Sequence, residues 1–145
     1  MVNLYRMRQL LRQTVKVQWR IEREQARATK ITTVLTGMPR GGGLHDQTGD
    51  GAVRLTELKE AYREVLEELE QMKAELGPMI DTIENADQRA AMRMRYIFGN
   101  SPEVIADAIC VADRTVFRYL AVAEADLCKR FPDKVNRSNI PVSCQ

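Results

Sequence analysis

The sequence predicts an all-α fold, with a long N-terminal antiparallel helical hairpin of coiled-coil type followed by a C-terminal helix-turn-helix domain. Only 6% of the 145 residues are aromatic, whereas Leu, Met, Ala, Glu and Arg recur throughout, a composition that suits helices better than strands. Apolar residues return at three- and four-residue steps in two long segments. Nearer the C-terminus, two helical segments are joined by about four residues, a spacing typical of a helix-turn-helix.

The first long segment, from about Asn3 to Thr29, contains neither glycine nor proline. Its stripe of three- and four-residue steps consists of Leu4, Met7, Leu11, Thr14, Gln18, Ile21, Gln25 and Ala28. Half of these positions are weakly apolar or polar, and Val15, Val17 and Trp19 lie off the stripe. We therefore expect a helix whose buried face is broader than a narrow seam or rotated along its length.

A loop is expected at about residues 36–51, because six of the eight glycines fall there together with a proline. Gly37 and Gly42 have the spacing of a phosphate-binding loop. Gly43, however, stands where that motif needs a lysine, and Leu44 where it needs serine or threonine. Nucleotide binding is therefore not expected.

The second long segment has an uninterrupted apolar seam at alternating steps of three and four. The seam consists of Leu55, Leu58, Tyr62, Val65, Leu69, Met72 and Leu76. Charged residues occupy the other faces, so this helix needs a partner helix. We expect residues 1–84 to form the hairpin, with Gly77-Pro78 interrupting or kinking its second helix.

Residues 85–131 form the expected C-terminal domain. Asp87 is the expected N-cap of a helix through Phe98 that stops at Gly99. Ser101 then caps a short helix that has Pro102 in its first turn. After the turn Cys110-Val111-Ala112-Asp113, a second helix starts at Ala112 or Asp113 and ends before Pro132. Residues 132–145 are expected to be a flexible tail.

The start of that second helix holds the candidate DNA contacts, because a recognition helix presents its N-terminal side chains to base edges. The exposed residues there are Asp113, Arg114, Thr115, Phe117 and Arg118. Arg114 and Arg118 are the best candidates, since arginine can contact guanine bidentately, and Thr115 can contact phosphate or a thymine methyl. Lys129 and Arg130 are candidate phosphate contacts. Two features depart from an ideal motif: Cys110 stands where glycine is favoured, and Asp113 would repel phosphate.

Composition argues against several other classes. His45 is the single histidine, which leaves almost no material for a histidine-based catalytic or metal site. Cys110, Cys128 and Cys144 are odd in number and widely spaced, so reduced thiols are expected, without disulfides or zinc. No apolar run approaches the roughly 20 residues that cross a bilayer. We expect a cytoplasmic protein that is not an enzyme and needs no cofactor.

The sequence also resembles small phage and prophage proteins, often of unassigned function, whose C-terminal domain is like region four of bacterial sigma factors. The resemblance extends to about Phe131. The resemblance rests on the residues Ala28-Thr29-Lys30, Met38-Pro39-Arg40-Gly41-Gly42-Gly43, Arg95-Tyr96-Ile97, Ile105-Ala106 and Arg114-Thr115-Val116. It implies a phage-type transcription regulator that binds double-stranded promoter DNA and contacts RNA polymerase.

Two other functions remain open from the sequence. A hairpin followed by a recognition domain also fits a small terminase subunit that recognises packaging DNA. The seam from Leu55 to Leu76 could instead serve a helical interaction module that never touches DNA. Because Val15, Val17 and Trp19 have no obvious partner, we also expect a homo-oligomer formed through the hairpin.

Overall fold

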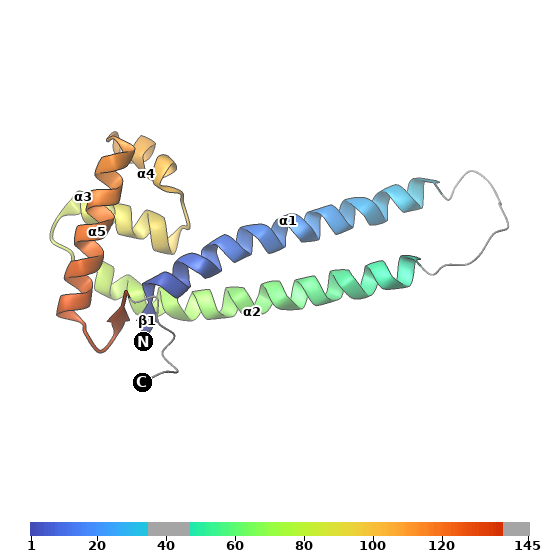
Figure 1. Ribbon diagram of the computed structural model, residues 1–145, viewed down its shortest axis with the longest axis horizontal. Coiled ribbons are helices and arrows are strands. Elements are labelled where there is room, and N and C mark those ends of the chain that lie inside the picture. Colours follow the sequence, from blue (N-terminus) through green and yellow to red (C-terminus); the bar gives the residue numbers. More distant parts are fainter. Residues whose placement is uncertain (35–46, 138–145) are drawn as a thin grey trace. The chain divides into compact units, whose positions relative to one another are not determined.

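A computed structural model describes residues 1–34 and 47–137, with side chains for 1–28 and 51–137. It confirms the all-α class (Figure 1). Its helices are Leu4–Val34 (α1), Gln47–Asp81 (α2), Ala86–Met92 (α3), Pro102–Ile109 (α4) and Asp113–Arg130 (α5), with a π-helical turn at Arg93–Ile97 (η1). Strands β1 (Val2–Asn3) and β2 (Val135–Asn136) pair in parallel, Val2 opposite Val135. Within the described ranges, no helix combines the length and the apolar character that a bilayer crossing requires.

Internal contacts divide the chain into two units that differ from the expected domains of 1–84 and 85–131. One unit is Arg12–Glu67, and the other combines Met1–Leu11 with Glu68–Gln145. Both α1 and α2 therefore contribute to both units. The reason is that the ends of these helices carry apolar residues, such as Leu4 and Ile80, that are fully buried with the C-terminal helices rather than in the long helical pair.

In the unit Arg12–Glu67, segments of α1 and α2 lie side by side and run in opposite directions (Figure 1). Val17 and Val65 are buried between them, and Ile21, Leu58 and Tyr62 are half-buried.

The glycine-rich loop expected at 36–51 is shorter at its C-terminal end, because α2 already begins at Gln47. Gly49 and Gly51 each lower helix propensity by about 1 kcal/mol relative to alanine, but they do not forbid the helix. The rest of that loop, including His45, lies outside the described residues.

The core of the other unit is formed by apolar side chains from every element in it. The largest fully buried ones are Leu4, Met7, Leu10, Leu69, Leu76, Ile80, Met92, Tyr96, Ile105, Val116 and Leu127. Of the two outcomes expected at Gly77-Pro78, an interruption or a kink, the interruption does not occur, since α2 continues through Pro78 to Asp81. The burial of Leu76, Met79 and Ile80 around this proline stabilises the helix enough to offset the lost backbone hydrogen bond.

The short helices begin and end at identifiable residues. Asn85, and not the expected Asp87, is the N-cap of α3: its side chain accepts hydrogen bonds from the amides of Asp87 and Gln88. Gly99 ends the following turn with φ of 72°, a value that glycine adopts without strain. Ser101 caps α4 as expected, with Pro102 in the first turn.

The segment expected to be a flexible tail begins with ordered structure. Val135 is buried and lies in β2, and the Val2 amide donates a hydrogen bond to the Lys134 carbonyl at 2.7 Å. Residues 132–137 are thus part of the fold because they carry an apolar side chain that packs in the core. The remainder of the expected tail, including Cys144, lies outside the described residues.

Candidate nucleic-acid interface

The helices α4 and α5 pack on each other through small and branched apolar side chains. Ile105 and Ala106 of α4 are buried together with Val116 and Leu120 of α5. The small side chain of Ala106 lets the two helices pack closely at this point. Of the two starts that the sequence left open, Asp113 is the first residue of α5, and Ala112 is its N-cap, although the methyl side chain of Ala112 accepts no capping hydrogen bond.

The turn between these helices has a left-handed residue at its start. Cys110 has φ of 56° and ψ of 48°, in the region that glycine occupies most readily. The amide of Val111 donates to the carbonyl of Ala106 at 3.0 Å, which closes the end of α4. The sequence already singled out Cys110 as standing where glycine is favoured, and the backbone explains why.

The start of α5 presents one exposed face. Arg114, Phe117 and Arg118 lie at three- and four-residue spacing and are all exposed, Phe117 to 56%. In the described part of the chain, neither arginine forms an ion pair with a carboxylate. Thr115 is half-buried beside Val116, so its side chain is less accessible than expected. The arrangement leaves two guanidinium groups and one aromatic ring directed to solvent directly after the turn.

Three exposed carboxylates lie on the same two helices as these arginines: Glu103 and Asp107 on α4 and Asp113 in the first turn of α5. The pKa of Glu103 is lowered by its own backbone amide and by the Ser101 hydroxyl at the start of α4, so it stays ionised at neutral pH. Acidic groups at helix N-termini are favourable for the helices. They also limit how many phosphates this surface can neutralise.

Lys129 and Arg130 lie at the other end of α5 and are not gathered with Arg114 and Arg118. The sequence separation of Arg114 and Lys129 corresponds to roughly 22 Å along a helix. Lys129 is exposed. The Arg130 guanidinium is engaged by other residues of the same chain. Its Nη1 donates to the Thr82 hydroxyl at 2.8 Å and to the Thr82 carbonyl at 3.2 Å. Its Nη2 lies 2.6 Å from Asp126 Oδ2. This geometry gives Arg130 a role in the fold that its sequence position did not reveal.

Comparison with known proteins identifies a family. The family model described as "Protein of unknown function (DUF1492)" matches residues 30–128, which is more than half of the chain. The chain belongs to this family. No curated protein and no solved structure matches it. The match includes α2, α3, α4, the Cys110 turn and nearly all of α5, so the candidate interface lies within the DUF1492 region.

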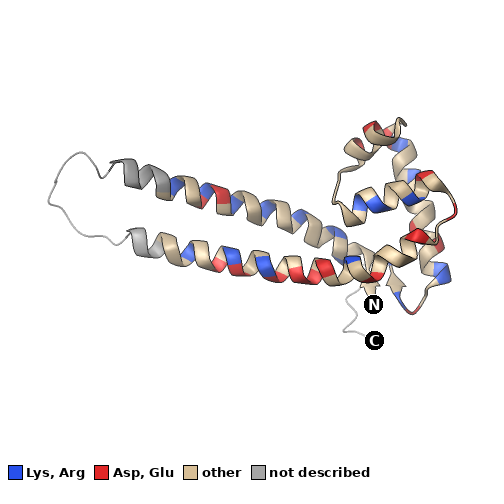
Figure 2. Cartoon of the chain, turned by 180° about the vertical axis from the view of Figure 1, so that it is seen from behind, with Lys and Arg blue, Asp and Glu red and all other residues tan. Residues whose placement is uncertain are grey.

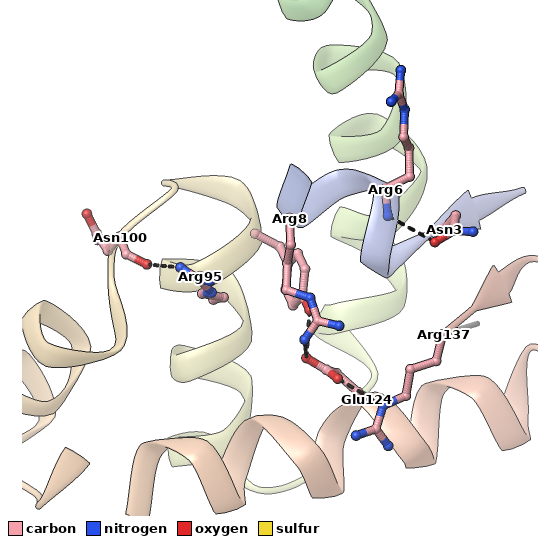
Figure 3. Close-up of polar contacts among 8 residues, drawn as sticks. Asn3, Arg6, Arg8, Arg95, Asn100, Glu124 and Arg137 are labelled. Carbon is pink, nitrogen blue, oxygen red and sulfur yellow. Dashed lines mark hydrogen bonds and ion pairs between the residues drawn. The ribbon is translucent and has the colours of Figure 1, made fainter. Parts of the chain in front are cut away.

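This DUF1492 protein also has a buried polar network behind α5 that sequence reasoning missed (Figure 3). Glu124 of α5 is only 3% exposed and accepts a hydrogen bond from the Tyr96 hydroxyl at 2.6 Å. Arg8 Nη1 lies 3.7 Å from Glu124 Oε1, and Arg137 Nε lies 3.2 Å from Oε2. Burial, reinforced by the Glu124 charge, raises the pKa of Tyr96 well above its ordinary value.

The sequence contained one part of the signal for this network, the position of Glu124, but not its partners. Glu124 lies within the apolar stripe of Val116, Leu120, Ala123 and Leu127, which is unusual for a carboxylate unless it has partners. The sequence could not identify those partners, because Arg8, Tyr96 and Arg137 are all distant from it along the chain. In the DUF1492 protein they connect α1, η1, α5 and the segment after β2, and so support the helix that carries Arg114 and Arg118.

Proposed function

We propose that this DUF1492 protein is a cytoplasmic, sequence-specific DNA-binding regulator of transcription, of phage type, in which α4, the Cys110 turn and α5 act as a helix-turn-helix. One observation carries the proposal: Arg114, Phe117 and Arg118 form an exposed face at the start of α5, directly after a short turn, on a helix buried along its opposite side. The N-terminal part of a recognition helix has this exposure when it enters the major groove.

Each side chain on this face has a defined role in the proposal. Arg114 and Arg118 donate to the O6 and N7 atoms of guanine, the commonest specific contact in the major groove. Phe117 packs against a thymine methyl group, and Thr115 contacts a phosphate at the edge of the groove. The resemblance to sigma region four supports a further contact with RNA polymerase once promoter DNA is bound.

The charge balance of the surface indicates weak binding by a single copy. Glu103, Asp107 and Asp113 are exposed on the same two helices as the two arginines, so few phosphates are neutralised and little counterion release accompanies binding. Arg130 contributes less than expected, because its guanidinium is engaged by Thr82 and Asp126. Regulators of this kind gain affinity when two copies read two half-sites about one helical turn apart.

The test begins with fragments of the host genome, from which the full-length protein recovers its preferred sites. On a recovered site, Arg118→Ala should weaken binding by about 1–3 kcal/mol and relax the preference at one base position. The Arg114→Ala, Arg118→Ala double variant should lose specific binding. Lys59→Ala, an exposed cation in the unit Arg12–Glu67, is the matched control and should bind normally. Normal specific affinity in the folded double variant would overturn the proposal.

The same recovery experiment separates the alternatives. Enrichment of promoters supports the regulator, whereas enrichment of a single packaging site supports a small terminase subunit. The protein-interaction alternative was expected to use the seam from Leu55 to Leu76, but Val65, Leu69 and Leu76 of that seam are buried within the chain. That function would need another surface. One is offered by large apolar side chains on α4 and α5 that are about half exposed, Val104, Phe117 and Val122. If the protein recovers no specific DNA at low salt, the protein-interaction function replaces DNA binding as the proposal.

A further inference from the structure

In the unit Arg12–Glu67, α1 has a line of cations along one side, which we call the basic stripe. It consists of Arg12, Lys16, Arg20, Arg23 and Arg27, all exposed. At about 100° per residue, these five side chains fall within an arc of roughly 80°. The arc is turned away from the buried Val17 and the half-buried Ile21. The two acids of this stretch, Glu22 and Glu24, lie outside it, and Figure 2 shows that Lys and Arg predominate along α1.

The partner helix α2 has the opposite charge on its own outer side. Its acidic stripe consists of Glu57, Glu60, Glu64 and Glu67, all exposed. They also span roughly 80° of the helix surface, opposite the buried Val65. The cations of this stretch, Arg54, Lys59 and Arg63, point in other directions.

Most residues of the two stripes have no ion pair with the residues that the structure describes. In the described part of the chain, Arg27 is the one stripe residue with an ion pair, to Glu24 at 3.2 Å. Arg20, Arg23 and Arg27 border an open hollow of about 240 Å³ together with Glu24 and Leu58. A carboxylate entering this hollow would meet three guanidinium groups.

Exposed apolar side chains accompany both stripes. Trp19 borders the basic stripe and is 60% exposed, with the Arg23 guanidinium 5.3 Å from its ring centroid. Val15 is exposed on the same side of α1. Val53 lies within the arc of the acidic stripe and is 58% exposed. Each charged stripe thus has an apolar component that could be buried in a contact.

We propose that the basic stripe of one copy docks on the acidic stripe of a second copy of this chain. Both stripes follow the same three- and four-residue period, and they extend over roughly 22 Å and 15 Å of helix. A single exposed ion pair contributes little to the stability of a contact. The role of the two rows of charge is therefore to select the partner and its register, as charges flanking a coiled-coil seam do. Burial of Trp19, Val15 and Val53 supplies the stabilisation.

The contact joins two different surfaces, so it is heterologous. A copy that offers its basic stripe to one neighbour still has its acidic stripe available for another. Heterologous contacts of this kind build rings or open chains of copies rather than isolated dimers. The expected assemblies therefore grow with protein concentration and weaken in about 1 M salt, where the attraction between the charged stripes is screened beyond about 3 Å.

Complementary charge reversal tests the proposal in the full-length protein, freed of nucleic acid, by sedimentation velocity at low salt. The basic-stripe variant is Lys16→Glu with Arg20→Glu, and the acidic-stripe variant is Glu60→Lys with Glu64→Lys. Each variant alone should be monomeric, while their equimolar mixture should associate, because it restores opposite charges. Arg54→Glu with Lys59→Glu makes the same change in net charge as the basic-stripe variant, away from the stripes, and should associate as the wild type does.

Trp19→Ala, which removes an exposed side chain without disturbing the core, should weaken wild-type association by tenfold or more if the ring is buried in the contact. Circular dichroism establishes that all variants remain helical. A wild-type protein that stays monomeric at low salt, or a mixture of folded variants that does not associate, would overturn the proposal. Association of the wild type that is unchanged by either reversal would do the same. If the basic-stripe variant loses affinity for non-specific duplex DNA and the mixture fails to associate, the stripe serves nucleic acid instead.

Discussion

The phenol of Tyr96 donates a hydrogen bond to the carboxylate of Glu124, with 2.6 Å between the two oxygens and both side chains buried. This pair joins η1 to α5. Arg8 and Arg137 approach the same carboxylate from the N-terminal helix and from the segment after β2. A buried carboxylate is tolerated because the Tyr96 hydrogen bond and two nearby guanidinium groups compensate for its lost hydration.

Removing the phenol hydroxyl tests the strength of that link. Tyr96→Phe keeps the ring in the core but takes one donor from Glu124, so we expect a loss of about 1–3 kcal/mol in the free energy of unfolding. Urea denaturation followed by circular dichroism measures it. The half-buried Tyr119 on α5 provides a matched control, because none of the described hydrogen bonds involves its hydroxyl. A loss below about 0.5 kcal/mol in Tyr96→Phe would contradict a stabilising role for the bond.

The same tyrosine should make stability depend on alkaline pH. Its pKa is raised above the ordinary value of 10.0, first by burial and then by the Glu124 charge. The contribution is therefore fully present below about pH 10 and is lost as pH rises toward the folded-state pKa. Between about pH 10 and 12, wild type should lose stability faster than Tyr96→Phe, by about 1.4 kcal/mol per pH unit. Parallel curves of stability against pH for the two proteins would show that Tyr96 ionises as readily in the folded state as in the unfolded state.

Gly99 and Gly51 should respond to alanine in opposite ways. Gly99 has φ of 72°, and a Cβ there would lie 3.3 Å from Leu11 Cδ2, so Gly99→Ala should destabilise the protein by about 1–2 kcal/mol. Gly51 lies inside α2, and a Cβ there has open space around it. Gly51→Ala should therefore stabilise the protein by up to about 1 kcal/mol. Thermal denaturation of the two variants measures both effects, and a stabilised Gly99→Ala would contradict the left-handed backbone at Gly99.

Replacing Cys110 with glycine should stabilise the protein. Its left-handed backbone costs a side-chain-bearing residue roughly 1–2 kcal/mol, so Cys110→Gly should raise the free energy of unfolding by about 1 kcal/mol. Cys110→Ala is the control, since it removes the thiol and keeps the Cβ, and it should leave stability nearly unchanged. Equal gains in both variants would mean that the thiol, and not the backbone, causes the strain.

Arg130 and Lys129 are neighbours on α5 with different expected effects. Arg130→Ala removes the hydrogen bonds to Thr82 and the ion pair to Asp126, and should cost about 1–2 kcal/mol because these groups are partly exposed. Lys129→Ala should stay within about 0.5 kcal/mol of wild type. If the Arg130 variant instead keeps full stability and loses one unit of salt slope in DNA binding, the original assignment as a phosphate contact holds.

The ends of several helices were predicted correctly from single residues, because a helix cap depends only on the few residues around it. Ser101, Pro102 and Gly99 each act through backbone requirements that their own chemistry satisfies. The N-cap of α3 was misassigned by two residues, because Asn85 and Asp87 both carry suitable side chains and only the backbone shows which one accepts the hydrogen bonds.

Long-range packing explains what the sequence could not predict. The buried line of α1 passes through Leu4, Met7, Leu10 and Val17, and shifts away from the predicted Leu11 and Gln18 because each stretch of the helix packs in a different unit. Pro78 is accommodated by the core around it. The exposed face of Arg114 and Arg118 followed from local spacing, whereas the internal engagement of Arg130 depends on Thr82, far away in the chain.

The pairing of Val2 with Val135 has a consequence for how the protein is made. A ribosome releases Val2 long before Val135, so the N-terminal strand must wait for all the residues between them before its partner emerges. The segment Arg12–Glu67 can pair its helices well before that time, because all of its contacts are already available. Translation therefore leaves Val2, Leu4 and Met7 without their complete core until Val135 has been made, and products that stop before Val135 should expose these side chains to chaperones.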